Sequence, residues 1–161
     1  MSRHSTDLGL SDGDKSVLQR REEHGWFVNM IMGDSDRPGF AYSFGLYQEF
    51  QHPEIIVFGL DSEIMHDIIN NAGDEIRKGA RYCAGDVTGE LLEGYNCAFR
   101  GVNALQYRET CSWAFWFYGN LDFPVLQLFW PDKRGRFPWD EGFTESMREL
   151  QPDLSQPPAS T

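Results

Sequence analysis

The sequence has no long hydrophobic run. Its opening residues, MSRHSTDLGLSDGDK, lack the apolar stretch of about 7 to 15 residues that a signal peptide needs, and no run of roughly 18 apolar residues occurs elsewhere. We therefore expect a cytoplasmic protein that does not enter a membrane.

Cysteine is scarce, and the motifs of common cofactor sites are missing. Cys83, Cys97 and Cys111 lie about fourteen residues apart without a C-x-x-C pair, which predicts reduced, buried thiols rather than disulfides or a zinc knuckle. No G-x-x-x-x-G-K-[ST] or G-x-G-x-x-G is present to hold a nucleotide. No cofactor can therefore be named from the sequence. The sequence also leaves the oligomeric state open.

Cations are also few. The 14 Lys and Arg residues oppose 25 Asp and Glu residues, which gives a net charge of −11 and disfavours a broad face for nucleic acid. The length of 161 residues, with 40% hydrophobic and 14% aromatic residues, predicts one folded domain. That domain is expected over 14–150, between a disordered N-terminal tail (1–13) and a flexible, Pro- and Ser-rich C-terminal tail (151–161).

Aromatic and β-branched runs predict strands at 26–32, 40–46, 54–60 and 123–130, and two more within 85–102 that turn at Glu93-Gly94. The first three have short connections, which favours an antiparallel meander. Helices are predicted at 14–24, 62–78 and 104–118. The sequence therefore predicts an α+β fold with a mostly antiparallel sheet, open or barrel-like, packed against two to three helices.

The helix at 62–78 has the clearest pattern. Its apolar residues recur every three or four positions: Ile64, Met65, Ile68, Ile69, Ala72 and Ile76. Gly79 follows the basic pair Arg77-Lys78, as expected at a helix end. His66 lies outside this stripe, so we expect it to face solvent.

Two histidines lie in settings that suit acid–base chemistry. His24 precedes Gly25-Trp26 at a predicted helix end, and His52-Pro53-Glu54 offers a base and a carboxylate at a loop-to-strand junction. The structural alternatives are a helix stop whose Trp26 anchors a strand, and a proline turn with an exposed histidine. The histidines form no H-x-x-x-H pair, so no metal site is predicted from spacing, although His24, His52 and Asp132 could meet through the fold.

The strand Tyr42-Ser43-Phe44-Gly45-Leu46 alternates aromatic with small residues, so that Ser43 and Gly45 share one face. A bare backbone there could admit a ligand, or Gly45 could simply serve packing or a bulge. The G-x-S-x-G of a nucleophile elbow is absent.

The segment 127–140 is the densest in unusual residues. Trp130 and Trp139 flank Asp132, and the cations Lys133, Arg134 and Arg136 follow it. In an acidic protein this loop could clamp a phosphate or carboxylate, with Gln127 nearby. The alternative is a hairpin with a basic tip whose two tryptophans hold the core.

Four segments in order resemble a bacterial family catalogued as domain of unknown function 4262. They are HGW (24–26), FAYSFGL (40–46), HPEIIVFGL (52–60) and QLFWPDKRGRFPW (127–139), and the likeness covers about residues 15–145. Ser43 stands where the family usually has Thr, which keeps the hydroxyl. The resemblance implies a bacterial or phage origin and a compact α+β domain, but no activity.

Three hypotheses follow from the residues. In the first, a binding module holds a small anionic ligand or a protein partner in an aromatic pocket lined by Trp26, Tyr42, Ser43, Glu54, Gln127, Trp130, Lys133, Arg134, Arg136 and Trp139. In the second, a hydrolase-type enzyme uses His24 or His52 as base, with Asp132 or Glu54 orienting it. In the third, the order of segments over 42–60 is similar to flavin-binding split barrels.

Overall fold

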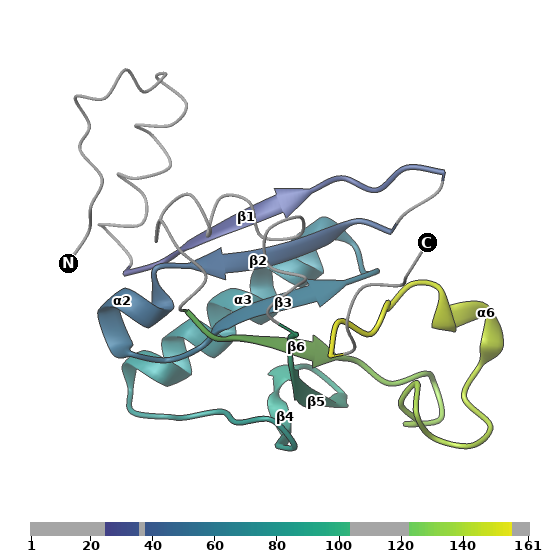
Figure 1. Cartoon of the computed structure of the whole chain (residues 1–161). Helices are drawn as coiled ribbons and strands as arrows, with labels where there is room; N and C mark the ends of the chain where they lie inside the picture. The colour runs from purple at the N-terminus through teal and green to yellow at the C-terminus, as the bar shows by residue number, and fades with distance from the viewer. Residues whose placement is uncertain (1–24, 36–37, 104–122, 156–161) are drawn as a thin grey trace.

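The computed structural model describes residues 25–35, 38–103 and 123–155 (Figure 1). Within them the chain forms one sheet with the strand order β1-β2-β3-β6-β5-β4. The strands are β1 (Phe27–Ile31), β2 (Phe40–Phe44), β3 (Glu54–Phe58), β4 (Val87–Leu92), β5 (Tyr95–Gly101) and β6 (Val125–Phe129). All neighbours pair antiparallel except β3 and β6, which are parallel. The predicted α+β class, the meander and the hairpin are confirmed, and the described sheet is open rather than barrel-like.

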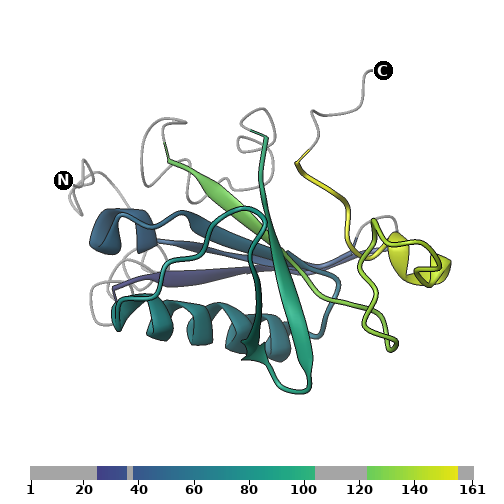
Figure 2. The same ribbon diagram turned by 90° about the horizontal axis from the view of Figure 1, so that it is seen from below.

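The central strands are covered on both faces. Every residue of β3 and β6 is buried, as expected for strands packed on each side. Ile55 and Val57 join the core under α3 (Ser62–Arg77), whereas Ile56 and Phe58 join a second cluster on the opposite face. Figure 2 shows α3 running along one side of the sheet.

The predicted helix at 62–78 matches α3 closely. Met65, Ile68, Ile69, Ala72 and Ile76 are buried as expected, and His66 is exposed. Ile64 is 38% exposed, so its assignment to the buried stripe is wrong. It lies in the first turn of α3.

Two short helices have no counterpart in the sequence prediction. They are α2 (Leu46–Phe50) and α6 (Glu145–Arg148). Neither is long enough to show an apolar period, and both depend on contacts from elsewhere in the chain. The strands predicted to end at Leu46 and Leu60 end two residues earlier, because Gly45 and Gly59 adopt positive φ angles of 109° and 83°.

Residues 151–155, which the sequence analysis assigns to the C-terminal tail, pack against the rest of the protein. Gln151 Nε2 donates to the Trp130 carbonyl and Gln151 Oε1 accepts from the Trp130 N–H, at 2.8 and 2.9 Å. Leu154 is buried in the second cluster. The predicted helices at 14–24 and 104–118 lie outside the described residues, as do the N-terminal tail, His24 and Cys111.

Cys97 is buried as predicted, and burial raises the pKa of its thiol to about 12. Cys83 is exposed, so the prediction of burial is wrong for this residue, which lies in the loop before β4. None of the described helices combines the length and hydrophobicity needed to cross a bilayer.

Candidate functional site

Glu54 is a buried carboxylate that organises the junction between β2 and α2. Its oxygens accept hydrogen bonds from the Ser43 hydroxyl at 2.7 Å and from the backbone N–H groups of Gly45 (3.0 Å), Leu46 (3.3 Å) and Tyr47 (3.0 Å). The first turn of a helix leaves such N–H groups without intrahelical partners, and the negative charge also suits that end. Ser43 Oγ in turn accepts the Ile55 N–H at 2.9 Å. The two predicted site residues Ser43 and Glu54 therefore meet, as an internal clamp.

His52 is completely buried and uses both ring nitrogens. Nε2 accepts the Tyr82 N–H at 2.9 Å, which places the ring proton on Nδ1, where it is donated to the Pro53 carbonyl at 2.8 Å. Burial lowers the pKa of His52, an effect that the Pro53 carbonyl opposes and the charge of Arg81 reinforces. An acid–base role would require this arrangement to open. The exposed histidine of the structural alternative is not observed either.

Asp132 is equally buried, and it holds the loop that follows β6. Oδ1 accepts the N–H groups of Arg134 (2.9 Å) and Arg136 (3.0 Å), and Oδ2 accepts the N–H (3.1 Å) and hydroxyl (3.2 Å) of Thr144. Burial raises the pKa of Asp132, but these hydrogen bonds outweigh it and lower the value to about 2. Arg136 Nε lies 3.3 Å from Oδ2, so the Arg136 cation is committed to Asp132.

Four other predicted site residues also bond internally. Gln127 Nε2 donates to the Pro152 carbonyl and its Oε1 accepts the Leu154 N–H, while Trp130 Nε1 donates to the Phe58 carbonyl. Trp26 Nε1 donates to Asn70 Oδ1, and the Tyr42 hydroxyl accepts from Asn29 Nδ2. These side chains lie on both faces of the sheet, and the fold does not bring them together in one pocket.

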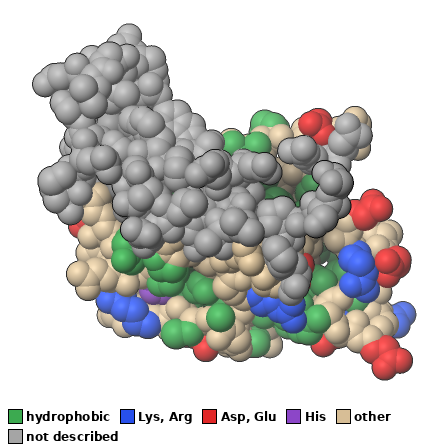
Figure 3. Space-filling model, viewed as in Figure 1, with side chains coloured by type: hydrophobic (Ala, Val, Ile, Leu, Met, Phe, Trp, Pro, Cys, Tyr) green, Lys and Arg blue, Asp and Glu red, His purple; other side chains and the backbone are tan. Residues whose placement is uncertain are grey.

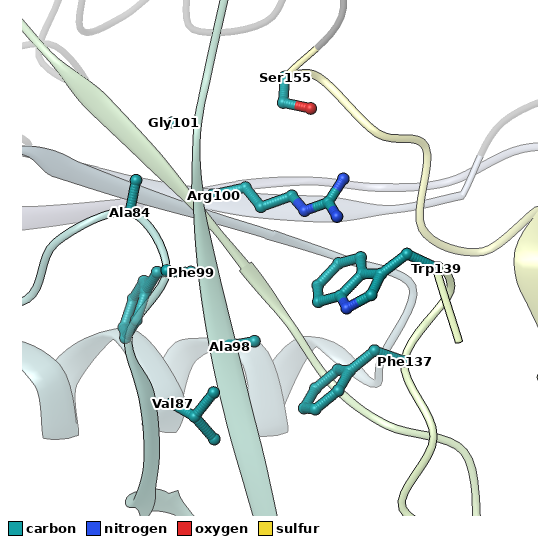
Figure 4. A pocket seen from close by; sticks show the side chains of 10 residues that line it. Ala84, Val87, Ala98, Phe99, Arg100, Gly101, Phe137, Trp139 and Ser155 are labelled. Atoms are coloured by element: carbon teal, nitrogen blue, oxygen red, sulfur yellow. The ribbon is translucent and has the colours of Figure 1, made fainter. Parts of the chain in front are cut away.

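Trp139 lines a hollow of about 540 Å³ beside β5 (Figure 4). Phe137 and Trp139 form one wall, and residues of β4 and β5 line the side opposite them. The lining residues are Ala84, Gly85, Val87, Ala98, Phe99, Arg100, Gly101, Phe137, Trp139 and Ser155.

Arg100 is the charged group of this hollow. Its guanidinium carbon lies 3.8 Å from the centroid of the Trp139 ring, and Nη1 lies 3.0 Å from Asp153 Oδ2. Trp139 stacks on Phe137 with centroids 5.2 Å apart and planes at 10°, and it meets Phe129 edge-on at 5.0 Å. The arrangement therefore fixes a cation above an indole that is itself held by two aromatic rings.

A second hollow of about 390 Å³ shares Phe137 with the first. It is lined by Gly89, Gly94, Tyr95, Asn96, Pro131, Lys133, Gly135 and Phe137. Lys133 and its neighbour Arg134 are exposed, and neither makes an ion pair with a described residue. Of the predicted loop cations, these two are thus the available ones.

Sequence reasoning missed Arg100, Tyr95 and Phe137 as site residues. Phe137 belongs to the segment quoted for the family likeness, but Arg100 and Tyr95 lie in a predicted strand without any motif. The only available signal was the strand alternation, which sends Arg100 to the face opposite the buried Phe99.

A family model described as "Domain of unknown function (DUF4262)" matches residues 21–144. The chain belongs to this family. The DUF4262 match confirms the resemblance and includes all six strands, the Glu54 and Asp132 clusters and the residues of both hollows except Ser155. Residues 151–155, which pack beside β6, lie beyond the DUF4262 match. Neither a curated protein nor a solved structure gives a match to the chain.

Proposed function

We propose that this DUF4262 domain is a binding module whose hollow beside β5 holds a small ligand with an anionic group on a flat apolar body. The observation that carries the proposal is the Arg100 guanidinium stacked over Trp139 at the rim of the 540 Å³ hollow. Aromatic walls with a few placed polar groups are the usual composition of ligand sites.

The geometry leaves Arg100 able to bind an anion. The ion pair with Asp153 is made through Nη1, and a guanidinium has five N–H donors in a planar fork that fits carboxylate and phosphate. Its side chain is 34% exposed. The flat part of the ligand would contact the ring edges of Phe137 and Trp139, whose positions are fixed by their stacking.

Binding is favoured over catalysis because of what lines the hollow. Its described lining contains no His, Asp, Glu or Cys, and the Ser155 hydroxyl in it donates a hydrogen bond to Asp153 Oδ1. The enzyme alternative uses His24 or His52 with Asp132. His52 and Asp132 are buried in hydrogen bonds elsewhere, and His24 lies outside the described residues. The flavin alternative rests on a split barrel, whereas the described strands form an open sheet.

The sequence supports a cytoplasmic setting, and the family resemblance supports a bacterial or phage origin.

The test is a titration with 2-naphthoate, a flat aromatic carboxylate, followed by backbone amide chemical shifts. We expect shifts around Ala98–Gly101 and Phe137–Trp139. Arg100→Gln and Trp139→Ala should each raise the Kd about tenfold, because each removes one contact worth roughly 1.4 kcal/mol. The matched control is Arg77→Gln, since Arg77 also lies over an aromatic ring, that of Trp26, and neither residue lines the hollow. If 2-naphthoate leaves these amides unshifted, or if both variants bind like the wild type, the proposal is wrong.

A further inference from the structure

We infer that the site extends past Phe137 into the second hollow and that its occupant is an acidic, aromatic-containing peptide segment of a partner protein. This inference rests on the proposed function, because it names the partner of the same site.

The two hollows form one elongated groove. Phe137 lines both of them, the β4–β5 hairpin supplies one wall of each, and the loop from Pro131 to Trp139 supplies the other. An occupant of both hollows would pass over Phe137, which suits an extended chain better than a compact molecule.

Apolar side chains are unusually exposed along this groove. Val87 is 57% exposed, Tyr95 42% and Trp139 39%, and each lines one of the two hollows. Exposed apolar surface of this kind marks contact sites, and Trp, Tyr and Arg are the residue types that contribute most to protein interfaces. Figure 3 shows hydrophobic, Lys/Arg and Asp/Glu side chains interspersed on the part of the surface below the grey residues.

The charges along the groove indicate that the partner segment is negatively charged. Lys133 and Arg134 are exposed without an ion pair to a described residue, and Arg100 lies at the far end of the groove. The chain as a whole carries a net charge of −11, so these cations are a local basic group on an acidic chain, which favours an acidic segment beside them. The difference between the local positive charge and the overall negative charge favours correct positioning of the partner.

Single-stranded nucleic acid would use the same kinds of side chain, but it needs aromatic faces that are free to stack on bases. Trp139 stacks on Phe137 and lies under Arg100, so the rings present edges to the groove more than open faces. The observations therefore favour a peptide.

The experiment compares two libraries of nine-residue peptides, each with one fixed Trp and either three Asp or three Lys at varied positions. We expect the full chain to select peptides from the Asp library. For the best of these, the double variant Lys133→Gln/Arg134→Gln and the single variant Tyr95→Ala should each raise the Kd about tenfold while leaving the Kd for 2-naphthoate unchanged. The matched control is Arg77→Gln/Lys78→Gln, an adjacent basic pair at the end of α3.

Each failure has a distinct signature. Equal selection from both libraries, or wild-type peptide affinity in the double variant, overturns the peptide inference while 2-naphthoate binding persists. Tighter binding of a dT12 oligonucleotide than of any Asp peptide, or self-association that the double variant abolishes, assigns the groove to another occupant and also overturns it. Unchanged 2-naphthoate binding in Trp139→Ala instead contradicts the proposed function itself.

Discussion

Around Glu54, a buried carboxylate accepts hydrogen bonds from a hydroxyl and three backbone N–H groups. Along the groove, by contrast, Lys133 and Arg134 extend into solvent and Arg100 is partly exposed above an indole. The polar groups around Glu54 form hydrogen bonds within the protein. The cations along the groove are exposed to solvent and can contact another molecule. Residues of one motif segment, 127–139, therefore differ in setting: Asp132 is buried in hydrogen bonds, whereas Lys133 and Trp139 are exposed.

The largest expected effect that would test this contrast comes from Glu54→Ala. The substitution leaves the Ser43 hydroxyl and the N–H groups at the start of α2 without their buried acceptor, so we expect the free energy of unfolding to fall by about 3 kcal/mol or more. Urea denaturation followed by circular dichroism measures it. The exposed Glu149→Ala serves as control and should stay within about 0.5 kcal/mol of the wild type. Equal stability of the two variants would mean that Glu54 is not a structural clamp.

A smaller, pH-dependent effect is expected at His52. Its pKa in the folded protein is below the ordinary value of 6.5, so the unfolded chain takes up the proton more readily. The stability that the neutral ring contributes is therefore fully present above pH 6.5 and is lost as the pH falls through the lowered folded pKa.

The measurement is the free energy of unfolding at pH 7.5, 6.5 and 5.5. The wild type should lose stability over this range, and His52→Gln should lose less. His66→Gln, which changes an exposed histidine, should keep the dependence of the wild type. The same loss in all three proteins would show that the His52 ring is not held neutral by the fold.

The smallest effect on stability is expected in the groove. Arg100 and Asp153 are about one-third exposed, and such ion pairs contribute roughly 0 to 1 kcal/mol. Arg100→Gln and Lys133→Gln should therefore lower the free energy of unfolding by about 1 kcal/mol or less in the same urea experiment, even though both weaken binding. If Arg100→Gln destabilises the protein as much as Glu54→Ala, the polar groups of the groove contribute to stability as much as those around Glu54.

Some of the fold follows directly from the sequence. The apolar runs that became β1, β2, β3 and β6 and the three- and four-residue spacing of α3 are local patterns, and a local pattern can be recognised without knowing its partners. The turn at Gly94 is equally local, because its φ of 84° favours glycine. The helix α2 could not be recognised in this way, since its first turn depends on a carboxylate that lies seven or more residues further along the chain.

In the candidate site, too, some residues could be predicted from the sequence and others could not. The sequence identified Trp139 and the basic run after Asp132 as candidates, because aromatic and cationic residues are informative by type alone. It could not separate Arg136, which pairs with Asp132, from Lys133 and Arg134, which do not. Nor could it identify Arg100, whose importance arises only when β5 lies beside the loop that carries Trp139.

By itself, then, the sequence determined the α+β class, the family and most strand positions, because hydrophobic periodicity and short motifs act over a few residues. The tertiary structure decided which polar residues are buried and which face solvent. Ser43 and Glu54 meet because β2 and β3 pair side by side, and the pKa of His52 is lowered because the folded chain buries its ring. Burial and hydrogen bonding depend on distant segments, and this is why the chemistry of these residues could not be read from their order in the chain.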